Sequence, residues 1–65
     1  MDQNDKAAFL AAYRGDLERV YRSLADAIVA AKSGEDLKAA KLKARNAVLL
    51  ARKTLLMCYE ILDEA

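Results

Sequence analysis

The chain has 65 residues, a formal net charge of +1, and 55% hydrophobic and 32% charged residues. It forms one small domain at most, and a single core of that size is only marginally stable without a disulfide, a bound metal ion or an oligomer. Cys58 is the only cysteine and histidine is absent, which excludes an intramolecular disulfide and, apart from carboxylates, the commonest metal ligands. The near-zero charge gives the molecule as a whole no strong attraction for nucleic acid or anionic lipid.

The amino-terminal stretch MDQNDK is acidic and polar, which does not fit a secretory signal. No uncharged run approaches the ~18 residues of a membrane span. We therefore expect a soluble, cytoplasmic protein that has no metal or cofactor and does not bind membranes.

The first predicted element is a long helix over about residues 4–32, because proline is absent and strong helix formers dominate. Gly15 is a weak point at which this helix could break into two. However, an apolar stripe with alternating spacings of three and four runs straight through it, and an interior glycine costs only about 1 kcal/mol. One unbroken helix is therefore favoured. The stripe consists of Leu10, Tyr13, Leu17, Val20, Leu24, Ala27 and Ala31.

The segment KSGEDL at residues 32–37 predicts a turn at about residues 33–35. Gly34 suits the left-handed conformation that ends a helix, and either Ser33 or Asp36 can cap the next helix. Such a short turn makes the two helices antiparallel.

The second predicted helix covers about residues 36–63 and has a matching stripe. Folding about Gly34 places Leu24 opposite Ala44, so large side chains of one helix meet small ones of the other. Residues 1–65 are therefore predicted to form a single all-α domain, a two-helix antiparallel hairpin. The second stripe consists of Leu37, Ala40, Ala44, Ala47, Val48, Ala51, Leu55, Cys58 and Leu62.

The second helix also has apolar residues away from this stripe. At 100° per residue, Leu42, Leu49 and Leu56 form a row well off the hairpin seam, and Leu50 and Met57 widen the seam on its other flank. A two-helix hairpin has only one internal seam, so many of these additional apolar residues must be exposed in an isolated monomer. Such a row usually marks an interface, although exposed leucines without a role are the alternative.

We therefore predict a non-enzymatic protein–protein interaction module, an adaptor, subunit or chaperone-type protein. Leu42, Leu49, Leu50, Leu56 and Met57 are the residues expected to contact another chain. The partner is either a second copy, most simply in a symmetric homodimer that forms a coiled-coil-like four-helix bundle, or another helical protein.

Residues for catalysis are not evident. A hairpin has no cleft to hold converging groups, and without histidine neither a Ser-His-Asp set nor an activated Cys58 can form. Cys58 lies on the apolar stripe, which is typical of a small buried hydrophobe. Asp16, Glu18 and Asp26 lie among arginines, which is typical of an ion-paired solvent face. We expect no enzymatic activity and no small-molecule ligand.

A basic stripe on the second helix, formed by Lys38, Lys41, Arg45 and Arg52, supports an alternative function. In a dimer, two such stripes could form a surface for phosphates. In layout the chain resembles the plasmid copy-number regulator Rop, a short helical hairpin that dimerises into a four-helix bundle and binds RNA. That resemblance implies a nucleic-acid-binding regulator. A solvated basic face that keeps the apolar rows soluble is the simpler explanation.

The hairpin with its glycine-containing turn is also similar to the small E-type co-chaperones of type III secretion needle assembly. That resemblance implies apolar faces that dock on a helical-repeat partner, which together with the hairpin holds the needle subunit.

Overall fold

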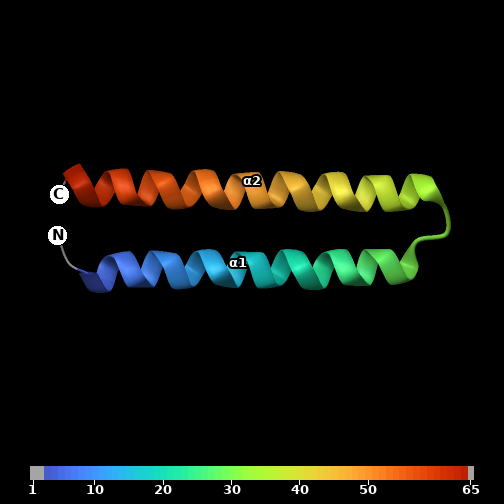
Figure 1. The fold of residues 1–65 in the computed structure, drawn as a ribbon, viewed down its shortest axis with the longest axis horizontal. Coiled ribbons are helices and arrows are strands. Elements are labelled where there is room, and N and C mark those ends of the chain that lie inside the picture. Colours follow the sequence, from blue (N-terminus) through green and yellow to red (C-terminus); the bar gives the residue numbers. More distant parts are fainter. Residues whose placement is uncertain (1–2, 65) are drawn as a thin grey trace.

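A computed structural model describes residues 3–64 as two antiparallel α-helices that lie side by side (Figure 1). Helix α1 comprises Gln3–Ala30 and helix α2 comprises Gly34–Glu64, and the two helices contact each other. The start of α1 and the end of α2 lie together at the end of the hairpin opposite the turn (Figure 1). The predicted all-α hairpin is confirmed.

Helix α1 is continuous through Gly15. This glycine has no positive φ, and a Cβ atom added to it would meet no heavy atom within 4 Å. The backbone at this point is therefore ordinary helix, as the uninterrupted stripe predicted.

The turn differs from its predicted position. It occupies residues 31–33 instead of 33–35, because α1 ends at Ala30 and α2 already begins at Gly34. Gly34 does not have a positive φ, so the expectation that it ends the first helix in a left-handed conformation is wrong. It is instead the first residue of the second helix.

Side-chain capping explains where α2 begins. The Oγ of Ser33 accepts a hydrogen bond from the backbone N–H of Asp36, at 3.2 Å, as in a helix N-cap. The Asp36 carboxylate in turn accepts a hydrogen bond from the backbone N–H of Lys32, at 3.0 Å. The first backbone bond of the helix runs from the N–H of Leu37 to the carbonyl of Ser33. Of the two capping candidates, Ser33 is the cap and Asp36 supports it.

The core is the seam between the two predicted stripes. Every residue of the α1 stripe is at least partly buried, and so is every residue of the α2 stripe except Leu37. Ala51 and Leu62 are the most buried, at 7% and 8% exposed. Leu37 is exposed because it lies in the first turn of α2, where the hairpin ends. No side chain of residues 3–64 is completely enclosed, as expected for a core that only two helices form.

At the open end of the hairpin, two interactions join the helices. Leu62 is buried there, and the Nζ of Lys6 lies 5.7 Å from the centroid of the Tyr59 ring, a cation–π distance. These contacts hold the start of α1 against the last turns of α2.

The hairpin is long and flat. Its backbone measures 49 × 15 × 7 Å, with a radius of gyration of 15.2 Å. A compact domain of 65 residues has a radius of gyration of about 11 Å. Each helix therefore has one face on the other helix and the rest of its circumference on the surface.

Candidate interaction surface

All five apolar residues of α2 that the sequence singled out for partner contact lie on the surface. Their exposed fractions range from 47% to 66%. Helix α1 covers only one face of α2, which leaves about half or more of each of these residues uncovered. They are Leu42, Leu49, Leu50, Leu56 and Met57.

These five residues do not form one patch. Leu42, Leu49 and Leu56 recur every seven residues and make a row on one flank of α2, here called the leucine row. Leu50 and Met57 lie on the other flank, because adjacent residues such as Leu49 and Leu50 point about 100° apart on a helix. Helix α2 thus has two separate apolar surfaces.

The flank with Leu50 borders a groove of about 410 Å³ between the two helices, so the expectation that a hairpin has no cleft is wrong. Most of its lining consists of alanine and larger aliphatic residues, with polar side chains at the edges. Because both helices contribute, the groove lies on a broad face of the hairpin, here called the groove face. The lining residues are Asp16, Arg19, Val20, Ser23, Leu24 and Ala27 of α1 and Ala40, Lys43, Ala44, Ala47, Leu50, Ala51 and Thr54 of α2.

The polar residues of the groove are largely engaged with near neighbours. Asp16 forms an ion pair with Arg19 one turn away, and the Thr54 hydroxyl donates a hydrogen bond to the Leu50 carbonyl oxygen at 2.8 Å. Lys43 adds one positive charge at the edge. The groove is therefore close to electrically balanced and has an apolar floor.

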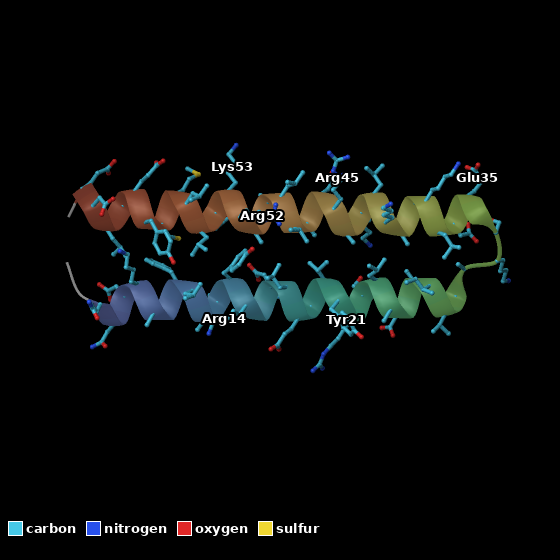
Figure 2. The ribbon with its side chains drawn as sticks, viewed as in Figure 1. Arg14, Tyr21, Glu35, Arg45, Arg52 and Lys53 are labelled. Carbon is cyan, nitrogen blue, oxygen red and sulfur yellow. The ribbon has the colours of Figure 1, made fainter. Side chains whose placement is uncertain are left out.

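The predicted basic stripe lies on the surface beside the leucine row. Lys38, Lys41, Arg45 and Arg52 are all exposed, and in the part of the chain that the structure describes none of them forms an ion pair. Figure 2 shows Arg45 pointing away from α1. This side of α2 is a band of unpaired positive charge.

The stripe and the row follow the same repeat. Each leucine of the row has a basic residue four positions before it, and residues four apart are neighbours on a helix surface. Every apolar residue of the row is therefore bordered by a cation. The three pairs are Lys38 with Leu42, Arg45 with Leu49, and Arg52 with Leu56.

Four further large apolar residues among residues 3–64 are exposed although the sequence did not single them out for partner contact: Tyr21, Ile28, Val29 and Ile61. Ile61 is 58% exposed and lies four residues after Met57, on the same flank. The spacing that linked Leu50 to Met57 could have extended that surface to Ile61. The other three lie on α1: Tyr21 and Ile28 each follow a leucine of the α1 stripe by four residues, at the edge of that stripe, and Val29 is 87% exposed.

The surface of residues 3–64 does not gather metal ligands: no three cysteine, aspartate or glutamate side chains lie close enough to hold an ion. Cys58 is a free, partly buried thiol in the seam. Neither α1 nor α2 combines the length and apolar character that crossing a bilayer requires.

No protein-family model, curated protein or solved structure matches this chain. The resemblances in layout to Rop and to the secretion co-chaperones therefore gain no support from these comparisons.

Proposed function

We propose that this chain is a non-enzymatic interaction module, an adaptor, subunit or chaperone-type protein, that completes its core by binding another helical chain. The supporting observation is the exposure of five large apolar residues on one helix. Fully burying a leucine or methionine side chain stabilises a complex by about 1.5–3 kcal/mol, so these residues offer a large driving force for association. A cytoplasmic location stays an expectation from the sequence.

The spacing of the leucine row fits a helical partner. From Leu42 to Leu56 the row spans 14 residues, roughly 21 Å along the helix axis. A seven-residue apolar repeat is the pattern with which helices pack along each other with interlocking side chains. The groove face offers a second apolar surface of a different shape.

Two double variants test this proposal. Leu49→Lys/Leu56→Lys places charges on the leucine row, and Leu50→Lys/Met57→Lys places them on the other flank. At least one pair is expected to lower the mass of the particle in light scattering or to remove a stoichiometric partner that copurifies with the parent. Val29→Lys is the matched control, because Val29 is 87% exposed on α1. Unchanged association for both pairs would rule the proposal out.

A second candidate function is nucleic-acid binding, and the unpaired basic stripe favours it. Phosphate contacts make affinity fall with salt, with a slope of about −0.9 per contact on a log–log plot for duplex DNA. Arg45→Gln/Arg52→Gln would remove two phosphate contacts, so the slope is expected to become less negative by about two. Fluorescence anisotropy with labelled RNA and duplex DNA across a salt series measures it. If the parent binds neither RNA nor duplex DNA at low salt, this function is excluded.

A further inference from the structure

The hairpin exposes more surface than a compact protein of its mass. It exposes 5422 Å². A folded monomer of 7.2 kDa exposes about 4,100 Å², so the surplus is about 1,300 Å². If two chains each buried that surplus, the interface would total about 2,600 Å², which lies within the roughly 2,000–5,000 Å² of obligate homodimers. Binding one partner of the same size is therefore enough to bury the excess exposed surface.

The shape of the hairpin fits stacking on a copy of itself. The backbone is 15 Å wide and 7 Å thick. Packed helices lie about 8–10 Å apart, so two stacked hairpins give a nearly square cross-section, as in a four-helix bundle. The groove face is broad and lined by both helices, and its alanine-rich floor leaves room for large side chains of a facing layer. Leu50, at the edge of the groove, is such a side chain.

Charge distinguishes the groove face from the leucine row as a surface for self-association. Among the residues that line the groove, the Asp16–Arg19 ion pair leaves Lys43 as the surplus charge, and Lys53, three residues after Leu50, adds one cation beyond the edge. At the leucine row, two copies would bring together two bands of unpaired cations, and like charges in contact oppose association. Self-association is therefore favoured at the groove face and disfavoured at the row.

We infer that a second copy of this chain closes the groove face, in a two-fold symmetric four-helix bundle that leaves the leucine row on the outside. The inference rests on the proposed function and names the partner and the surface. In a two-fold dimer each residue of the face contributes twice, once from each chain. Val20 and Leu24 of α1 and Leu50 of α2 then pack against the other copy.

Leu49 and Leu50 provide a matched pair for the test, since they are adjacent, exposed leucines on different flanks of α2. Sedimentation equilibrium of the parent is expected to give twice the chain mass of 7.2 kDa, about 14.4 kDa. Leu50→Lys should raise the dimer dissociation constant at least about 100-fold, because the substitution occurs on both chains, whereas Leu49→Lys should change it less than about threefold. A monomeric parent, or a dimer lost in Leu49→Lys and kept in Leu50→Lys, would overturn the inference.

Folding can depend on dimerisation, so a second measurement uses the unmodified protein. In a dimer of one ¹³C-labelled and one unlabelled chain, isotope-filtered NOEs are expected from the methyl groups of Val20, Leu24 and Leu50 to the other copy. NOEs from Leu42 and Leu56 in their place would contradict the inference.

The two proposals fail differently. A monomeric parent that loses a copurifying protein in Leu49→Lys/Leu56→Lys would refute self-association and support the interaction module. A monomeric parent with no partner affected by either double variant would refute both.

Discussion

Replacing Gly15 by alanine is expected to stabilise the protein. Gly15 lies in the interior of α1, where its φ is not positive and an added Cβ would meet no atom within 4 Å. Alanine therefore fits without strain. It also loses less backbone freedom on folding than glycine does, which favours the helix.

The size of the effect follows from helix propensity. Alanine exceeds glycine by roughly 0.5–1 kcal/mol inside a helix. A 65-residue protein has an unfolding entropy of about 0.14 kcal/mol/K, taking about 2.1 cal/mol/K per residue. Gly15→Ala should therefore raise the melting temperature by about 4–7 °C.

Thermal unfolding followed by circular dichroism at 222 nm, at a fixed protein concentration, measures this shift. Gly34→Ala is the companion variant, and at the first position of α2 it should change stability by less than about 0.5 kcal/mol. A lower melting temperature for Gly15→Ala would mean that α1 bends at residue 15. A loss of about 1–2 kcal/mol in Gly34→Ala would mean that Gly34 is left-handed after all.

Three further substitutions test the seam, the cap and the open end. Leu62→Ala should cost about 2–3 kcal/mol in urea unfolding because the leucine is 8% exposed, whereas Val29→Ala, at an exposed site, should cost less than about 0.5 kcal/mol. Equal effects at the two sites would contradict the described seam. Ser33→Ala should lower stability by about 1 kcal/mol, with Ser33→Asp close to the parent, and a neutral alanine would exclude the N-cap. Lys6→Met keeps the apolar stem and should cost about 0.5–1 kcal/mol relative to the parent; an unchanged Tyr59 environment in NMR would argue against the cation–π contact.

The sequence by itself determined the helices and the faces they bury. Apolar spacings of three and four run through the seven positions from Leu10 to Ala31 and, apart from the adjacent Ala47 and Val48, through the nine positions from Leu37 to Leu62. This repeat fixes the angular position of each side chain. The exposure of Leu42, Leu49 and Leu56 followed from the same geometry. Periodicity is a local property of a helix, so it can be read without knowing the fold.

The turn was predicted less well, because its signals compete within a few residues. Gly34 suits the end of one helix, but it is also acceptable at the start of the next. The hydrogen bond between the Ser33 hydroxyl and the Asp36 backbone decides in favour of the start. Which signal prevails depends on which cap the folded chain can form.

The groove was decided by the tertiary structure alone. The sequence paired Leu24 with Ala44, and both residues line the groove, yet helical angles contain no information on the space left between two helices. That space depends on how far apart the packed side chains hold the helix axes and on how the two flanks align. The separation of Leu50 from Leu49 already follows from their helical angles, and the tertiary structure adds the groove beside Leu50.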